Sequence, residues 1–139
     1  MANHHIETQW MGKMQFNALV NDHTVIMDAP ERAGGEDNGS IPKPFILAAL
    51  TGCAGMELLS LLKKSKTAII NLNIKTSGEL TKQIPYHYTA LDVIFEINCA
   101  KEVKSEVENG INEVMKTICG VSFMLQKIMP VTWKVAFQD

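Results

Sequence analysis

The sequence predicts a single α+β domain that spans residues 1–139. Three observations support this class: segments of alternating apolar and polar residues lie at both ends, one long central segment is apolar on every side, and internal repeats are absent. Alternation with a period of two is typical of strands that bury one face, whereas an all-round apolar segment of this length is typical of a buried helix. The chain length also favours one domain with its own core.

The first part of the chain predicts a three-stranded antiparallel meander. Its strands are expected at Gln9–Met11, Gln15–Val20 and Thr24–Met27, because turn signals, Gly12-Lys13 and Asn21-Asp22, separate these alternating segments. Residues 29–42 then change to proline, glycine and acidic side chains without hydrophobic periodicity. A long loop is therefore expected there, and loops of this length inside compact domains are usually functional or disordered.

The central helix is expected to begin near Lys43 and to end near Ser65. A helix that is apolar on all sides belongs in a core or at a buried interface. Small residues cluster around Cys53 in this segment, and a glycine inside a helix costs about 1 kcal/mol relative to alanine. We therefore expect another element to pack very close to the helix around Cys53.

The second half of the chain predicts a hairpin, two helices and a terminal strand. The hairpin is expected from two strand-like stretches, Ala68–Leu80 and Tyr86–Asn98. An amphipathic helix over Glu102–Lys116 follows, then a break and a short helix over Val121–Ile128. The last strand is expected at Val131–Phe137.

Composition excludes several classes of function. The formal net charge is −2 and the pI is about 6.1, so neither nucleic acid nor an anionic membrane surface is an expected partner. Apolar residues make up 46% of the chain, but no apolar run approaches the ~20 residues of a membrane span. The N-terminal residues lack the pattern of a signal peptide, so a cytoplasmic location is expected.

The chemistry of the chain is expected to lie in its cysteines. Cys53 lies in the middle of the central helix, and Cys119 lies at a helix N-terminus, where backbone amides lower a thiol pKa below its usual value of ~8.5. A redox-active pair is one interpretation; the other is that both are small buried hydrophobic residues, since no Cys-x-x-Cys motif supports the first. Cys99 ends a strand and is interpreted as structural.

Two charged residues are candidates for supporting roles. Arg32 is the only arginine in the chain, and its guanidinium could hold a thiolate or a peroxide oxygen; the alternative is an ordinary solvated loop charge. Glu57 follows Cys53 by one helical turn and shares its face. This carboxylate could act on the thiol as a base or simply pair with a lysine.

No metal or cofactor is expected. The four histidines do not fall at zinc-ligand spacing with the cysteines, and the chain has no Gly-x-Gly-x-x-Gly, Walker or Gly-x-Ser-x-Gly motif.

Several sequence blocks resemble the OsmC/Ohr family, which comprises osmotically inducible protein C and organic hydroperoxide resistance protein. The blocks are Asp28–Pro30, Gly34–Gly39, Leu47–Glu57 and Cys119–Ser122, and Thr76–Leu80 matches the OsmC-like branch. The resemblance covers nearly the whole chain. It implies an intertwined homodimer with antiparallel sheets wrapped around long central helices and two active sites at the subunit interface.

The resemblance also implies thiol peroxidase chemistry. The Cys53 thiolate would attack an organic hydroperoxide and become a sulfenic acid, Cys119 would capture it as a disulfide, and an external dithiol would restore both thiols. In the family an arginine and a glutamate support the reactive cysteine, and Arg32 lies about where such an arginine is expected. The glutamate is expected where this chain has Lys43-Pro44. Without it the arginine loses the partner that orients it, so we expect weak peroxidase activity or a site that relies on Glu36, Asp37 or Glu57.

Two functions follow from these observations. The first is a cysteine peroxidase of the two-cysteine type. The second is a non-catalytic dimer of the same fold that binds a small hydrophobic ligand at the subunit interface, as the missing glutamate and the 8 methionines suggest.

Overall fold

A computed structural model describes residues 2–139. The chain forms two compact units, of which unit 1 ends at Ile46 and unit 2 comprises Leu47–Asp139. Both units contain a three-stranded sheet, and the helices longer than one turn lie after Lys43.

Unit 1 contains the expected antiparallel meander. Strands β1 (Glu7–Trp10), β2 (Phe16–Val20) and β3 (His23–Met27) pair in that order. Val20 is paired with His23 across a two-residue turn, and both turn residues, Asn21 and Asp22, have positive φ values of 50° and 66°. Such turns match the right-handed twist of the strands, which explains why the Asn-Asp pair predicts this hairpin.

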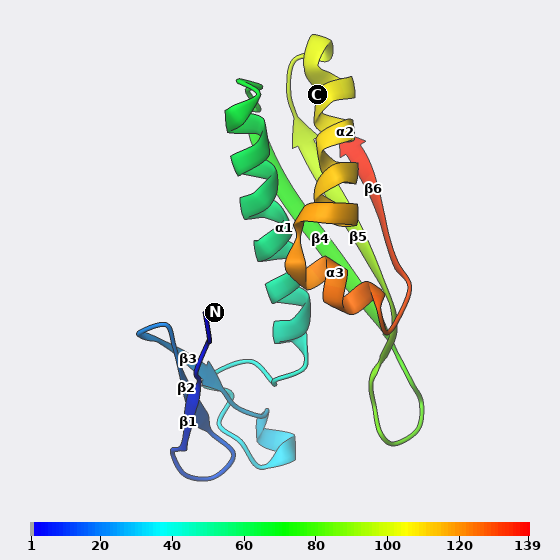
Figure 1. The fold of residues 1–139 in the computed structure, drawn as a ribbon. Helices are drawn as coiled ribbons and strands as arrows, with labels where there is room; N and C mark the ends of the chain where they lie inside the picture. The colour runs from blue at the N-terminus through cyan, green and yellow to red at the C-terminus, as the bar shows by residue number, and fades with distance from the viewer. Residues whose placement is uncertain (1) are drawn as a thin grey trace. The chain divides into compact units, whose positions relative to one another are not determined.

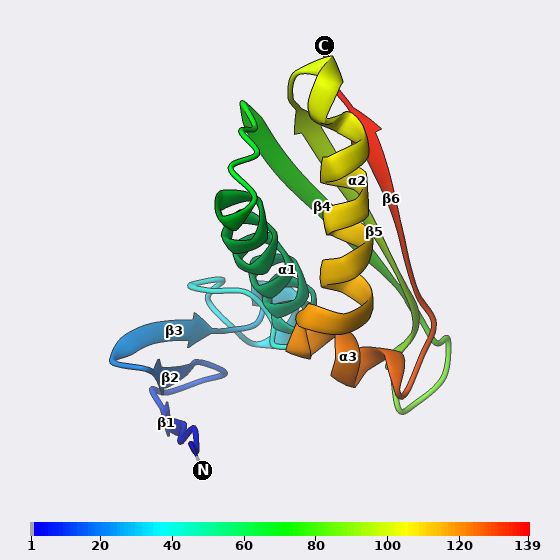
Figure 2. The ribbon, with the colours of Figure 1, turned by 45° about the horizontal axis from the view of Figure 1, so that its top comes forward.

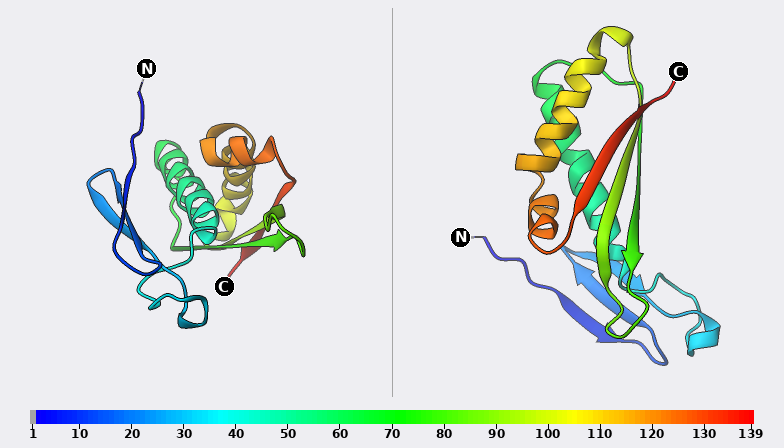
Figure 3. Two further views of the ribbon diagram at one scale, coloured as in Figure 1. Left: turned by 90° about the horizontal axis from the view of Figure 1, so that it is seen from below. Right: turned by 90° about the vertical axis from the view of Figure 1, so that its right-hand side faces the viewer.

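Unit 2 is a sheet with helices on one face. Helices α1 (Pro44–Lys64) and α2 (Lys104–Glu113) lie side by side on the same face of the sheet β4–β5–β6 (Figures 1 and 3). The first residues of α1 precede unit 2, and the rest of the helix packs inside it. The expected helix from near Lys43 to near Ser65 is therefore present.

The sheet of unit 2 combines a hairpin with a parallel strand. Strands β4 (Asn71–Leu80) and β5 (Tyr88–Asn98) form the expected antiparallel hairpin. The last strand, β6 (Val131–Phe137), has the expected bounds but pairs with β5 in parallel. The chain reaches this parallel position through the helices between β5 and β6, because a parallel pairing requires a crossover connection. The α+β class is confirmed, with β5 and β6 as the parallel pair among strands β1–β6, whose other pairs are antiparallel.

The core of unit 2 lies between the sheet and the helices. Helix α1 contributes Leu50, Ala54, Leu58 and Leu62, each at most 3% exposed, and β5 contributes alternate residues from Leu91 to Ile97. The close packing expected around Cys53 is present at Gly55, where an added Cβ would lie 3.2 Å from Ile74 of β4. It is absent at Gly52, where an added Cβ would meet nothing within 4 Å.

The opposite face of α1 is exposed and apolar. Met56 and Leu59 are 74% and 50% exposed. With a mean hydropathy of 1.9, α1 is also long and apolar enough to cross a membrane, so the expectation that no segment approaches such a span was wrong. Isolated polar residues such as Thr51 and Glu57 interrupt the apolar run in the sequence but barely change the mean hydropathy of the helix. One face of α1 nevertheless packs in the core cluster of unit 2.

The segment after β5 differs from the expected single amphipathic helix. Helix α2 ends at Glu113, and the chain continues as a π-helical turn, η3 (Val114–Ile118), before the short helix α3 (Gly120–Gln126) changes direction (Figure 2). One-turn 3-10 helices, η1 (Glu31–Ala33) and η2 (Lys101–Val103), complete the fold. The Trp133 indole of β6 donates a 2.9 Å hydrogen bond to Asn112 of α2, which ties the last strand to this helix.

Candidate active site

The two candidate cysteines come from different helices and meet in the core of unit 2. Cys53, in the middle of α1, is partly buried and packs against the core cluster, of which Cys119 is itself a member. Cys119 is 1% exposed and occupies the N-cap position of α3. The Cys53 side chain lies close enough to contribute to the raised pKa of the Cys119 thiol. The fold therefore places together two thiols that are far apart in the sequence.

The Cys119 thiol is held in its protonated form. Burial, followed by the neighbouring Cys53, raises the pKa of Cys119 to about 11, although the backbone amides of Ser122 and Val121 oppose the shift. The Ser122 N–H donates to Cys119 Sγ at 3.4 Å, as expected of a helix N-terminus. The expectation that this position lowers the thiol pKa was nevertheless wrong, because the loss of solvation outweighs the amide contacts.

Ser122 and Gln126 surround Cys119 and did not emerge from the sequence as candidates. Ser122 is fully buried, and its hydroxyl donates to the Met115 carbonyl at 2.8 Å. The Gln126 amide donates to the same carbonyl at 2.8 Å and to the Ser122 hydroxyl at 2.7 Å. The available signal was the spacing Cys119-x-x-Ser122, which is that of an N-cap side chain and the amide that it accepts from.

Glu57 shares a face of α1 with Cys53 and is partly buried. The expected alternative, a pairing of this carboxylate with a lysine, is not found among residues 2–139, where the ion pairs are Lys13–Glu36 and Lys75–Glu96. Glu57 is thus a carboxylate one helical turn from the reactive-cysteine candidate.

Arg32 lies in η1 of unit 1 and is exposed. The loop that carries it is ordered, and Asp28 organises it. The buried Asp28 carboxylate accepts hydrogen bonds from the backbone amides of Ala29 (2.8 Å), Asn38 (3.1 Å) and Glu36 (3.2 Å). These amides, that of Asn38 foremost, hold the pKa of Asp28 below its ordinary value.

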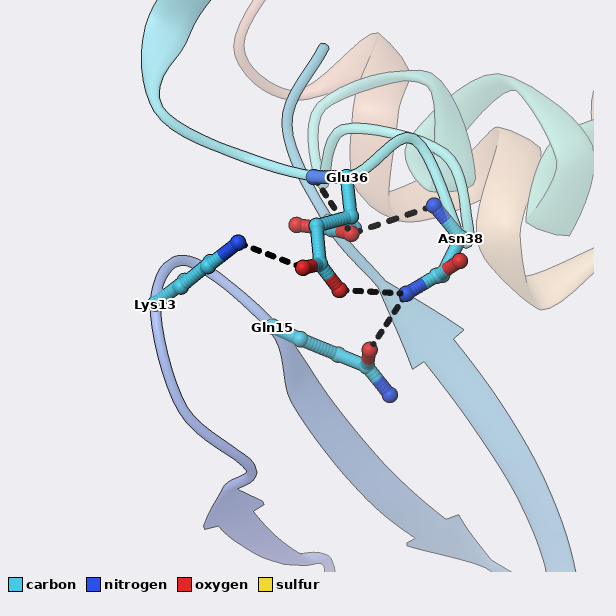
Figure 4. A network of polar contacts seen from close by, with 5 residues as sticks. Lys13, Gln15, Glu36 and Asn38 are labelled. Carbon is cyan, nitrogen blue, oxygen red and sulfur yellow. Dashed lines mark hydrogen bonds and ion pairs between the residues drawn. The ribbon is translucent and has the colours of Figure 1, made fainter. Parts of the chain in front are cut away.

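A second set of contacts ties this loop to the first hairpin (Figure 4). The Lys13 ammonium pairs with the Glu36 carboxylate, which lowers the pKa of Glu36 and raises that of Lys13. The Asn38 amide donates to Gln15 at 3.0 Å and to Glu36 at 3.4 Å. Glu36, a possible substitute for the missing family glutamate, is thus engaged in holding the loop.

The glycines of the loop are required by packing. A Cβ at Gly35 would lie 2.0 Å from the Ala29 carbonyl oxygen, and one at Gly39 would lie 2.3 Å from that of Ile26. Real Cβ atoms do not approach backbone atoms this closely, so any larger residue would open the loop. Arg32 is therefore presented by a loop of defined shape.

The first turn of α1 carries no acidic residue, as the Lys43-Pro44 sequence indicated. Cys99 is 9% exposed at the end of β5 and belongs to the core cluster. Within residues 2–139, no group of three His, Cys, Asp or Glu side chains is arranged to hold a metal ion.

Comparisons with known proteins identify the fold and the family. The OsmC-like protein family matches residues 35–134. Protein YhfA of Escherichia coli K12 is 21% identical over 125 residues, which cover 89% of this chain and 90% of YhfA. An OsmC-like protein from Mycoplasma pneumoniae has the same fold with a TM-score of 0.85 and 15% identity, over 99% of both chains.

Two solved organic hydroperoxide resistance proteins also share the fold. The protein from Legionella pneumophila has a TM-score of 0.69 and 12% identity, over 98% of both chains. OhrB of Bacillus subtilis has a TM-score of 0.63 and 16% identity, over 99% of this chain and 98% of that one. At these identities the structural likeness establishes the fold, while the family match spans most of the chain and includes both cysteines. The chain therefore belongs to the OsmC family, as its sequence blocks indicated.

Proposed function

We propose that this protein reduces organic hydroperoxides by a two-cysteine mechanism. The observation that supports it best is the neighbouring position of Cys53 and Cys119 in unit 2. The fold is shared with organic hydroperoxide resistance proteins. The organic substrate class rests on this relationship and on the apolar side chains around the cysteines.

The proposed reaction transfers two electrons from sulfur to the peroxide. The Cys53 thiolate attacks one peroxide oxygen, so that an S–O bond forms, the O–O bond breaks, and the alkoxide leaves and takes a proton to become the alcohol. The Cys119 sulfur then attacks the Cys53 sulfenic acid. An S–S bond forms, and the released hydroxide combines with the Cys119 proton as water. An external dithiol supplies two electrons and two protons to restore both thiols.

The division of roles between the cysteines follows from their surroundings. Cys53 is partly exposed, so a peroxide can reach it, whereas Cys119 is 1% exposed. The raised pKa of Cys119 keeps this thiol protonated and unreactive toward peroxide near neutral pH. Cys53 is therefore assigned as the attacking residue and Cys119 as the resolving residue.

Arg32 and Glu57 are assigned supporting roles. Arg32 is exposed on an ordered loop, and a guanidinium can donate hydrogen bonds in a fixed fork to a peroxide oxygen or a thiolate. Glu57 lies one helical turn from Cys53 and can act as the base that removes the thiol proton. We expect loss of Arg32 to slow Cys53 oxidation and to leave the disulfide step unchanged.

We further propose that the protein works as a cytoplasmic homodimer. The exposed side of α1 in unit 2 carries Met56 and Leu59, which lie one helical turn apart, and exposed apolar surface of this kind marks an interface. Gly52 lies beside them with open space around it, so another helix could approach closely there. A reducing compartment would supply the dithiol that the cycle consumes.

Single-cysteine variants test the mechanism. Cys53→Ser should abolish peroxide-dependent consumption of dithiol. Cys119→Ser should form the Cys53 sulfenic acid, detectable with a dimedone probe, without forming the disulfide. Cys99→Ser is the matched control and should behave like the unaltered protein. Undiminished turnover by Cys53→Ser would rule the mechanism out.

The absence of an acidic residue from the first turn of α1 supports a second candidate, a non-catalytic dimer that binds a small hydrophobic ligand. Native mass spectrometry of gently purified protein separates the two. A ligand that recurs across preparations, together with thiols that survive excess peroxide, would favour the second candidate.

A further inference from the structure

The turn before Cys119 has an unusual backbone hydrogen-bond pattern. In an α-helix, the N–H of Cys119 would bond to the carbonyl of Met115, four residues earlier. In η3 it donates instead to the carbonyl of Val114, five residues earlier, at 2.8 Å. The π-helical turn therefore leaves the Met115 carbonyl without the N–H group that would bond to it in an α-helix. Turns of this kind are rare and are often found at functional sites.

Side chains of α3 satisfy the Met115 carbonyl. Ser122 and Gln126 both donate to it at 2.8 Å, and the remaining Gln126 amide hydrogen is directed to the Ser122 hydroxyl at 2.7 Å. Every hydrogen in this group then has one acceptor, which also fixes the orientation of the Gln126 amide. We call the Met115 carbonyl, Ser122 and Gln126 the carbonyl clamp.

The carbonyl clamp is coupled to the thiol through Ser122. The side chain of this fully buried residue holds the Met115 carbonyl, while its backbone N–H donates to Cys119 Sγ at 3.4 Å. Two hydrogen bonds thereby fix the position of Cys119. Its backbone N–H donates to the Val114 carbonyl in the π-helical turn, and its sulfur accepts from the Ser122 N–H at the start of α3.

We propose that Ser122 and Gln126 are positioning residues for the resolving thiol, because the carbonyl clamp keeps the π-helical turn in the form that places Cys119 next to Cys53. The inference rests on the proposed two-cysteine reaction. A disulfide forms only when two Cβ atoms approach to ~3.5–4.5 Å with a restricted dihedral angle. A buried carbonyl without a donor is unfavourable, so loss of the carbonyl clamp favours return of the turn to α-helical bonding. Each residue of an α-helix is rotated by ~100° from the last, so this change would turn Cys119 away from Cys53.

The test uses Gln126→Met as the main variant, because Gln126 is exposed outside its amide contacts and methionine is similar in length. Ser122→Ala removes the second donor and keeps the backbone contact with the sulfur. Thr117→Val is the matched control, since Thr117 belongs to the same turn and its hydroxyl donates to the Glu113 carbonyl at 2.9 Å, outside the carbonyl clamp. Rapid-quench mass spectrometry measures sulfenic acid formation at Cys53 and disulfide formation separately with cumene hydroperoxide.

We expect both carbonyl-clamp variants to slow disulfide formation about tenfold or more, since a shift of ~1 Å in reacting groups can cost far more than that. Sulfenic acid formation at Cys53 should stay within about twofold, and Thr117→Val should match the unaltered protein in both steps. Without peroxide, the pH profile of Cys119 alkylation should shift to lower pH in the clamp variants, because the released thiol regains contact with water.

The alkylation profile keeps the two proposals separate. If the unaltered protein forms no disulfide with peroxide, the proposed function fails, and the alkylation profile still decides whether the carbonyl clamp holds Cys119. The positioning role is overturned if the clamp variants leave both disulfide formation and the Cys119 profile unchanged. It is equally overturned if they slow Cys53 oxidation as much as disulfide formation, because that pattern indicates a general loss of structure.

Discussion

The protonation of Cys119 gives the sharpest quantitative prediction, and pH is the perturbation that tests it. Burial and the neighbouring Cys53 raise the pKa of this thiol from 9.0 to about 11. At pH 8 the thiolate fraction is then about one in a thousand, compared with about one in ten for a thiol of unshifted pKa. The expected loss of thiolate is therefore about 100-fold.

The loss of reactivity is smaller than the loss of thiolate. Thiolates of higher pKa are stronger nucleophiles, with a Brønsted coefficient of ~0.4–0.5, so two pKa units return a factor of about ten in thiol–disulfide exchange. The reactivity of Cys119 is then about tenfold lower than that of a thiol with an unshifted pKa, and burial lowers it further because it limits access of the reagent. The steepness of the pH profile is the more secure readout: the Cys119 rate should rise about tenfold per pH unit from pH 8 to 10, because the thiolate fraction does so below the pKa.

The assay is exchange with a small disulfide reagent, followed by acid quench and peptide mass spectrometry. Cleavage after lysine and arginine places Cys53, Cys99 and Cys119 in three different peptides, so each is followed independently. The raised pKa of Cys119 also makes the stability of the fold depend on pH in a defined direction. A raised folded-state pKa stabilises the fold fully below pH 9.0, and this stabilisation is lost as the pH rises toward about 11. A Cys119 rate that levels off below pH 9 would show instead that the amide contacts outweigh burial and that the thiol pKa is not raised.

The remaining predictions concern packing, the Asp28 loop and the subunit interface. A Cβ at Gly78 would lie 2.5 Å from the Tyr88 ring, so Gly78→Ala should lower the free energy of unfolding by about 1–3 kcal/mol in urea titrations; an unchanged midpoint would contradict this packing. The amide contacts that depress the pKa of Asp28 stabilise its loop above pH 3.8 and are lost as the pH falls through the lower folded-state pKa. Hydrogen exchange should therefore show protection of the Glu36 and Asn38 amides at pH 6 that weakens in acid and in Asp28→Asn; protection that ignores both changes would exclude this role. Met56→Glu places a charge on the exposed apolar face of α1 and should shift the proposed dimer to monomer in light scattering, whereas Lys101→Glu, at an exposed lysine of η2 outside α1, should not; a Met56→Glu protein that keeps the parent mass would exclude this face as the interface.

Much of the fold follows from periodicity in the sequence. The strand Val131–Phe137 has its expected bounds, and α1 ends within a residue of the expected position. The parallel pairing of β6 with β5 could not be predicted from the sequence, because alternation in one strand does not specify the direction of its partner. The π-helical turn was hidden for a related reason: a single extra residue in a turn hardly alters a 3.6-residue pattern over Glu102–Lys116.

The candidate site, like the fold, could be predicted from the sequence only in part. The residue types at Cys53 and Cys119, with the surrounding blocks, were sufficient to predict a cysteine pair and the family. They were not sufficient to predict the raised pKa of Cys119. A helix N-terminus can be recognised in the sequence, but the depth of burial that outweighs its effect on the thiol cannot. Ser122 and Gln126 were missed because the carbonyl that they bind becomes available only through the π-helical turn.

Titration of the fully reduced protein with cumene hydroperoxide, with free thiols counted and disulfides mapped after each addition, is the decisive test of the two-cysteine mechanism. We expect that two thiols are lost per protein at low peroxide, that Cys99 stays reduced, and that a Cys53–Cys119 disulfide accumulates. Thiols that survive excess peroxide, or a disulfide that involves Cys99 instead, would contradict it.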